Sequence, residues 1–134
     1  MNMTKPQLSI AETRNSPAVF FDHRIFKLSG ISTMVDAMEF YAPLLALFDV
    51  GADPHSEEID IEIHLSYYNS SSNKCIYQLM EKVKLLSDKG VKINVCWCVE
   101  EEDEFMREGG QTLEELLGLQ FSYKQVPFNQ NRLF

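Results

Sequence analysis

Two segments of this chain alternate strictly between apolar and polar side chains, and they limit its possible folds more than any other feature. Residues 58–68, EIDIEIHLSYY, and residues 91–99, VKINVCWCV, each carry an apolar side chain at every second position. This period predicts β-strands with one buried and one exposed face. The residues between them, 70–89, follow a helical period and end at Gly90, a residue that suits the position after a helix. A strand, a helix and a strand in succession form a right-handed crossover, so the two strands should pair in parallel.

Apolar spacing and turn residues also predict the elements that precede this unit. Thr33 is expected to cap a helix, with Asp36 three residues later, and Pro43 lies inside it. One face of that helix should be apolar, because residues at alternating spacings of four and three share a helical face: Met34, Met38, Tyr41, Leu45 and Phe48. Before it, two short apolar strands predict a hairpin: 18–22 and 24–30.

An acidic helix and a last strand are predicted after the second alternating segment. The helix should begin near Glu101 and stop at the pair Gly109–Gly110. Thr112 with Glu115 forms a second capping box, which should open a short helical turn. The last strand is expected at 119–126.

Together these elements predict an α/β fold with a mostly parallel, mixed sheet of five strands and an N-terminal hairpin. Strands that are buried on both faces read as continuous apolar runs. The alternating strands therefore predict helices mainly on one face of the sheet and an open second face. We expect a flexible N-terminal arm at 1–16, a single domain at 17–126 and a C-terminal tail at 127–134.

Composition and charge restrict the function. The chain has 134 residues, of which 45% are hydrophobic and 24% charged, as is typical of one folded domain. Its formal net charge is −8, so we expect no nucleic-acid partner and no binding to anionic membranes. We also expect no membrane insertion and no signal peptide, since no suitable apolar run is present. Three cysteines, an odd number, fit a reducing compartment, and the expected localisation is cytoplasmic.

Three consecutive serines, Ser70 to Ser72, open the central predicted helix, and no acidic residue lies within 63–80. The first turn of a helix usually carries acids, because its N–H groups lack partners and its dipole is positive there. With histidine neutral, Lys74 is the only formal charge in this segment, so the helix start suits an anion. The anion could be a bound ligand or a phosphoserine, which adds about −1.5 to −2 charge. Alternatively, Ser70 or Ser71 only caps the helix.

The stretch YYNSSSNK, at 67–74, resembles a motif of the SiaC family of bacterial regulatory phosphoproteins. Members typically show Tyr-Phe/Leu-Asn-Thr-Ser-Ser-x-Lys at a helix start, followed by a Trp-containing strand and an acidic segment. FMREGG at 105–110 and FYAPLLALF at 40–48 are also similar to family segments, and the likeness covers most of 17–126. Family members resemble STAS-type anti-sigma-factor antagonists in fold. The resemblance therefore implies a STAS-like fold and a single SiaC-like domain.

The resemblance also implies a function that is regulatory and not enzymatic. In this family a partner kinase phosphorylates the hydroxyl residue just after the Asn, and a metal-dependent phosphatase removes the phosphate. The unphosphorylated form binds and activates a diguanylate cyclase. In this chain the phosphoacceptor falls on Ser70, where the family usually has Thr, and no cofactor is implied. The residues expected to contact the partner or the anion are Asn69, Ser71, Ser72 and Lys74. The alternative function is a small-molecule phosphate- or anion-binding module without covalent modification.

Further residues carry separate hypotheses. Cys96 and Cys98 should share a strand face and could form a metal or redox pair, and Cys75 lies in a first helical turn, where a thiol pKa can fall. His64 could serve as a base to a serine nucleophile in a hydrolase, but no triad is recognisable. The acidic run EEEDE at 100–104 lacks the glycine and the ligand spacing of a calcium loop. We therefore expect a solvated helix start there, no metal site and no enzymatic activity.

Overall fold

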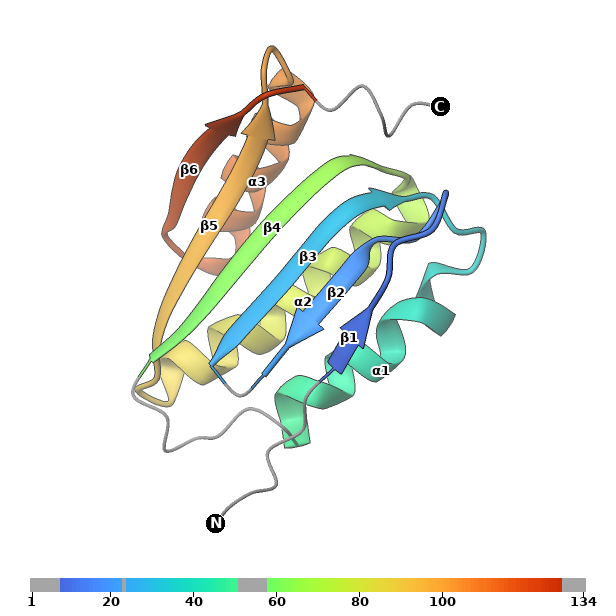
Figure 1. The fold of residues 1–134 in the computed structure, drawn as a ribbon. Coiled ribbons are helices and arrows are strands. Elements are labelled where there is room, and N and C mark those ends of the chain that lie inside the picture. The colour runs from blue at the N-terminus through green and yellow to red at the C-terminus, as the bar shows by residue number, and fades with distance from the viewer. Residues whose placement is uncertain (1–7, 23, 51–57, 129–134) are drawn as a thin grey trace.

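The computed structural model describes residues 8–22, 24–50 and 58–128. The strands form a single sheet in which the order in space is the order in the chain (Figure 1). The first two pairings are antiparallel and the remaining three are parallel. The strands are β1 (Leu8–Ile10), β2 (Ala18–Phe21), β3 (Ile25–Ser32), β4 (Glu58–Tyr68), β5 (Lys92–Glu100) and β6 (Phe121–Val126). The helices are α1 (Ala37–Val50), α2 (Ser70–Asp88) and α3 (Glu104–Leu117).

The sheet is mixed and mostly parallel, as predicted, but the described residues contribute six strands to it and not five. The additional strand is β1, which lies in the segment predicted to be a flexible arm. Its Leu8 pairs with Phe21 and its Ile10 with Val19 in an antiparallel register. Three residues are too few to show a period, so only the pairing with β2 reveals this strand. The rest of the predicted arm, 1–7, and the end of the predicted tail lie outside the described residues.

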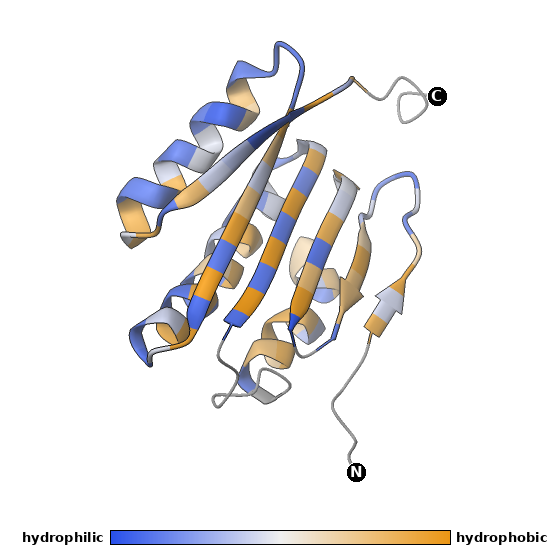
Figure 2. Ribbon diagram, turned by 60° about the vertical axis from the view of Figure 1, so that its left-hand side comes forward, coloured by the Kyte–Doolittle hydropathy of each residue, from blue (hydrophilic) through white to orange (hydrophobic). Residues whose placement is uncertain are grey.

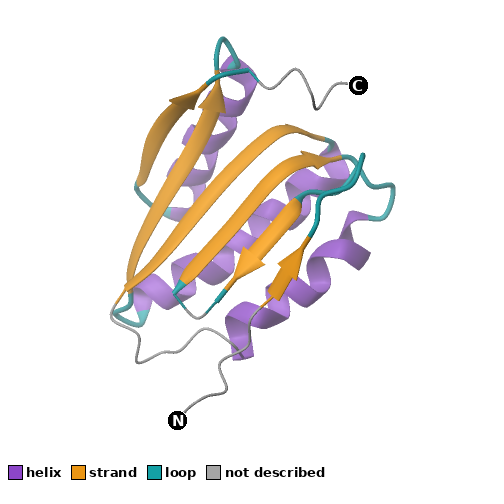
Figure 3. Ribbon diagram, viewed as in Figure 1, coloured by secondary structure: helices purple, strands orange, loops and turns teal. Residues whose placement is uncertain are grey.

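The helices cover one face of the sheet and leave the other face open, as the alternation predicted (Figure 3). Hydrophobic and hydrophilic residues alternate along β3, β4 and β5 (Figure 2). Burial of the apolar set against the helices removes each of these side chains from water, which is the main stabilising contribution to such a core. The buried strand residues include Phe26, Leu28, Ile59, Ile61, Ile63, Leu65, Val95 and Trp97.

Helix α1 begins later than predicted, and its buried face shares Tyr41 and Phe48 with the predicted face. Oδ1 of Asp36 accepts a hydrogen bond from the N–H of Glu39 at 3.3 Å, so the predicted cap at Thr33 is wrong. The helix continues through Pro43. Most residues of α1 are apolar, and the spacing alone therefore could not choose among several possible apolar faces. The buried face consists of Ala37, Tyr41, Leu44 and Phe48.

Helix α3 is continuous, so the predicted stop at Gly109 and Gly110 is wrong, and Thr112 lies in the helix interior and not at a cap. The two glycines permit close packing. A Cβ atom at Gly110 would lie 2.8 Å from Cδ1 and Nε1 of Trp97, and one at Gly109 would lie 2.5 Å from the hydroxyl oxygen of Tyr68. Both distances are shorter than ordinary van der Waals contact. The glycines are therefore explained by the sheet residues that pack beneath the helix.

Strands β4 and β5 separate toward their carboxyl ends. They pair as far as Ile63 with Trp97, although β4 continues to Tyr68 and β5 to Glu100. Strand β3 instead follows β4 to its last residue. Figure 1 shows the diverging ends of β4 and β5. Side chains must therefore hold the two strands together at this edge of the sheet.

Candidate functional site

The helices begin at the same edge of the sheet, which is the carboxyl edge of the parallel strands (Figure 1). Strands β3, β4 and β5 are neighbours and run in parallel, and they are followed in the chain by α1, α2 and α3. This edge is where α/β sheets usually bind ligands, because the N–H groups at the helix starts point toward it. The start of α2, where the sequence predicted a site, lies between the starts of the other two helices.

Asn69 caps helix α2. Its Oδ1 accepts a hydrogen bond from the N–H of Ser72 at 2.9 Å, and its Nδ2 donates to the carbonyl oxygen of Met34 at 3.1 Å. Its own N–H donates to the carbonyl oxygen of Ser32 at 3.0 Å. The interpretation in which Ser70 or Ser71 serves as the cap is therefore wrong. Because Asn69 holds the turn, the hydroxyl groups of the serines after it are not needed for capping.

The three predicted serines have different environments. Ser72 is fully buried, and its Oγ donates to the carbonyl oxygen of Ser32 at 2.9 Å and accepts from Oγ of Ser32 at 2.7 Å. That Ser32 hydroxyl also contacts the hydroxyl of Tyr41, at 2.8 Å. Ser71 is exposed, and its Oγ accepts from the N–H of Ala37 at 3.4 Å, at the start of α1. Ser70 is exposed at the first position of the helix. Ser70 and Ser71 are therefore accessible, whereas Ser72 belongs to the core.

The charges around the start of α2 are unevenly distributed. The first turn of α2, all of which the structure describes, holds no acidic residue, and the exposed Lys74 follows one turn later. Burial raises the pKa of the Cys75 thiol, and the nearby carboxylate of Asp36 raises it further. The hypothesis of a reactive thiol with a lowered pKa is therefore not supported, and Cys75 is an ordinary buried cysteine. The helix start remains a place where an anion would meet N–H groups and one lysine.

The cap at Asn69 and the exposed hydroxyl of Ser70 give contrasting predictions. We expect Asn69→Ala to lower the free energy of unfolding by about 1–2 kcal/mol, because the N–H of Ser72 loses its acceptor. We expect Ser70→Ala to change it by less than about 0.5 kcal/mol, because an exposed side chain is removed. Urea denaturation of both variants measures this difference. Equal losses for the two variants would contradict the assignment of the cap.

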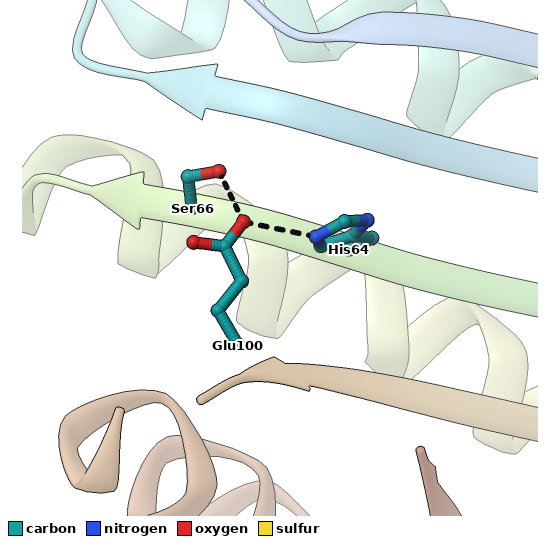
Figure 4. A network of polar contacts seen from close by, with 3 residues as sticks. All are labelled: His64, Ser66 and Glu100. Atoms are coloured by element: carbon teal, nitrogen blue, oxygen red, sulfur yellow. Dashed lines mark hydrogen bonds and ion pairs between the residues drawn. The ribbon is translucent and has the colours of Figure 1, made fainter. Parts of the chain in front are cut away.

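A second polar cluster lies between the ends of β4 and β5 (Figure 4). One carboxylate oxygen, Oε2 of the buried Glu100, accepts a hydrogen bond from Oγ of Ser66 at 2.7 Å and lies 3.0 Å from Nε2 of His64. In a catalytic triad the imidazole lies between the serine and the acid, whereas here the carboxylate lies between the serine and the imidazole. This geometry does not make His64 a base for Ser66. The cluster instead joins two strands where their backbones no longer pair.

The cysteines form neither a metal cluster nor a redox pair in the described part of the chain. Cys75, Cys96 and Cys98 are free thiols, and no group of three or more potential metal ligands occurs among the described residues. Burial raises the pKa of the Cys98 thiol to about 12, and the neighbouring Cys96 contributes to the rise. A thiol that holds its proton so strongly is a poor nucleophile and a poor metal ligand.

The buried Cys98 predicts a loss of stability at alkaline pH. Its folded-state pKa, about 12, is above the ordinary value of 9.0, so the unfolded chain releases this proton at a lower pH than the folded chain does. The stabilising contribution is complete below pH 9.0 and is lost as the pH rises toward 12. We expect Tm to fall through this window, and to fall less in Cys98→Ala. Identical alkaline losses in both proteins would show that the thiol is not responsible.

Comparison with known proteins identifies the class and then the family. Residues 10–126 match the family model of a regulatory phosphoprotein, which gives the class of the protein. The family is described as "SiaC family regulatory phosphoprotein", and the chain belongs to it. No curated protein sequence matches the chain significantly. Among the described helices, none has the length and apolar character needed to span a membrane.

Solved structures of SiaC from Pseudomonas aeruginosa share the fold. Apo-SiaC superposes with a TM-score of 0.77 at 16% identity, covering 89% of this chain and 98% of that chain. A second SiaC structure gives 0.81 at 16% identity, over 90% and 99% of the two chains. SiaC in a complex described as "diguanylate cyclase SiaD in complex with its activator SiaC" gives 0.78 at 17%, over 89% and 99%. At these identities the likeness establishes the fold alone.

Proposed function

We propose that this chain is a non-enzymatic, cytoplasmic signalling regulator that is switched by phosphorylation of Ser70. A protein kinase adds the phosphate, a phosphatase removes it, and the unphosphorylated form binds a diguanylate cyclase. The observation that carries the proposal is the exposed Ser70 hydroxyl at the start of a helix that Asn69 already caps. Membership of a regulatory phosphoprotein family supports the switch. The activator role of SiaC toward the cyclase SiaD supports the partner.

The environments of the three serines favour Ser70 as the phosphoacceptor. A phosphate on Ser72 would break buried hydrogen bonds with Ser32 and bury a charge, which is very costly. A phosphate on Ser71 would lie against the start of α1, whose N–H at Ala37 the hydroxyl already contacts. Ser70 has neither constraint. A kinase can therefore reach its hydroxyl without disturbing the packing of α1 or α2.

The same geometry explains how a phosphate would oppose partner binding. Phosphorylation adds about −1.5 to −2 charge and three acceptor oxygens. In the free protein these oxygens would be stabilised by water, by the N–H groups of Ser70 and Ser71, and by Lys74, which follows four residues later on the same helix face. The partner would have to remove the water when it covers the site. The phosphate would therefore stabilise the free form more than the complex, and binding would weaken.

The test of the switch is mass spectrometry of the protein from its native cells, with and without phosphatase treatment. We expect one phosphate, located on Ser70 by fragmentation of its peptide and absent after treatment. A Ser70→Ala variant expressed in the same cells is the matched control and should carry none. Absence of phosphate under several growth conditions, or phosphate confined to Ser71 or Ser72, would contradict the proposal. The first of these outcomes would favour the alternative of a small-molecule anion-binding module.

A further inference from the structure

Large apolar side chains are exposed around the start of α2, on the three neighbouring segments of the carboxyl edge. Val35 and Met38 lie at the start of α1, Tyr67 near the end of β4 and Phe105 in the first turn of α3. Their exposed fractions are 98%, 40%, 53% and 60%. Exposed apolar groups that are gathered in one place and rimmed by polar residues mark interaction sites in soluble proteins. We call these four residues the apolar edge patch.

Two contacts place the first turn of α2 between the segments that carry Val35, Met38 and Phe105. Oγ of Ser71 accepts from the N–H of Ala37, which lies between Val35 and Met38 in the chain. On the other side, the ring of Phe105 packs against Tyr68, with centroids 5.6 Å apart. The backbones of β4 and β5 no longer pair at this edge, but the ring contact between Phe105 and Tyr68 keeps the start of α3 next to the end of β4. A single partner surface can therefore cover the whole patch.

Acidic side chains form the rim of the patch on two sides. On the α1 side Asp36 and Glu39 are exposed, and on the α3 side the turn before the helix and its first residue contribute Glu101, Glu102, Asp103 and Glu104. Asp36 and Asp103 are used as helix caps, but the glutamates are not. Glu101, Glu102, Glu104 and Glu39 are all solvent-exposed. An acidic rim attracts a basic surface and disfavours an acidic protein or an anionic membrane.

From this juxtaposition we propose that the apolar edge patch docks a protein surface that presents apolar side chains flanked by lysines or arginines. The proposal rests on the proposed function, since it describes the surface by which the unphosphorylated regulator holds its partner. Ser70 opens α2, which begins between the α1 and α3 parts of the patch, so a partner that covers both parts would desolvate its phosphate. The basic partner surface would be guided by the acidic rim and held by the apolar residues.

Site-specific photo-crosslinking in native cells tests the location of this surface. The photoreactive residue p-benzoylphenylalanine replaces Phe105 in one version of the full chain and Val35 in another. The control places the photoreactive residue at Leu85, whose exposed fraction of 56% is close to that of Phe105. Leu85 lies about 22 Å from Ser70 along α2, at 1.5 Å per residue. We expect crosslinks from Phe105 and Val35 to a peptide rich in lysine or arginine, and none from Leu85. No crosslink at either edge position would overturn the proposal.

The outcomes separate this inference from the proposed function. Edge crosslinks to a basic segment of a diguanylate cyclase support both. Edge crosslinks to a basic segment of a different protein support the docking surface and count against the cyclase as the partner. A cyclase that crosslinks only at Leu85 overturns the docking surface and leaves the proposed function standing. Edge crosslinks to an acidic segment overturn the inferred chemistry of the partner.

A charge reversal on the rim tests the proposed attraction between the acidic rim and a basic partner surface. The partner protein identified by crosslinking is purified and titrated with Glu39→Lys/Glu104→Lys and with a matched control, Glu81→Lys/Glu115→Lys. The control makes the same change of net charge at exposed acids of α2 and α3 outside the rim. We expect Glu39→Lys/Glu104→Lys to bind at least tenfold more weakly and the control to bind like the unchanged chain. Binding of the unchanged chain should also weaken as salt is added. Tighter binding by Glu39→Lys/Glu104→Lys would overturn the proposal.

Discussion

Replacing Ser70 by aspartate is expected to weaken the complex with the proposed partner, a diguanylate cyclase, roughly a hundredfold, or by about 2.7 kcal/mol, without destabilising the free chain. A carboxylate at the first position of α2 meets unpaired N–H groups and the positive end of the helix dipole, which favours the folded state by about 0.3–1 kcal/mol. In the complex the same carboxylate would be removed from water inside the contact. Isothermal titration measures the change in Kd, and thermal denaturation should show an equal or slightly higher Tm.

Two variants control this result. Ser70→Ala keeps the site neutral and should bind the cyclase like the unchanged chain. Ser87→Asp adds the same charge to the same helix, about 25 Å from Ser70 at 1.5 Å per residue, and should also leave binding unchanged. Wild-type affinity in Ser70→Asp would show that the start of α2 lies outside the contact. A loss shared by Ser70→Asp and Ser87→Asp would indicate a general effect of net charge.

The sequence was sufficient for the elements with long and regular periods. The alternating strands β4 and β5 and the helix between them occur where they were predicted, and Ile76, Leu79, Met80, Val83 and Leu86 form the buried face of α2. Gly90 has a positive φ of 97°, as the predicted position after the helix requires. The period of the apolar side chains shows which face of a helix or strand is buried. In β4, α2 and β5 this face follows from the local sequence alone. The parallel sheet with one open face followed from these elements.

Features that depend on contacts between distant segments were not predictable in the same way. Nothing local distinguishes Ser72, which is buried against Ser32, from the two accessible serines before it. Asn69 was named as a site residue, but its role as the cap became visible only in the structure, where its Oδ1 accepts from the N–H of Ser72 and its Nδ2 donates to Met34. Glu100 was assigned to a solvated acidic run, yet it is buried. Glu100 continues the even-numbered positions that carry the polar side chains of β5. This was the one indication in the sequence that it belongs to the strand.

Gly110 gives the largest expected effect on stability. Its added Cβ in Gly110→Ala would lie 2.8 Å from Cδ1 and Nε1 of Trp97, and that ring is fully buried and stacked on Phe121 at 5.6 Å. Alanine favours a helix over glycine by about 1 kcal/mol. Overpacking costs about 1–3 kcal/mol, and disturbing the bond from Nε1 to the carbonyl oxygen of Met106, 2.9 Å long, costs about 1–3 kcal/mol more. The clash outweighs the helix propensity, so we expect a net loss of about 1–5 kcal/mol in urea denaturation.

Two comparisons separate this clash from a general effect on α3. Thr112→Ala changes an exposed position of the same helix and should be neutral or slightly stabilising, since alanine is the better helix former. Trp97→Phe removes Nε1 and replaces the indole by a smaller ring, so adding Gly110→Ala to it should cost less than Gly110→Ala alone, with a coupling of about 0.5–3 kcal/mol. A Gly110→Ala variant as stable as Thr112→Ala would contradict the packing argument. Because α3 also carries Phe105, the loosened helix should hold the apolar edge patch less firmly and weaken partner binding even where the chain remains folded.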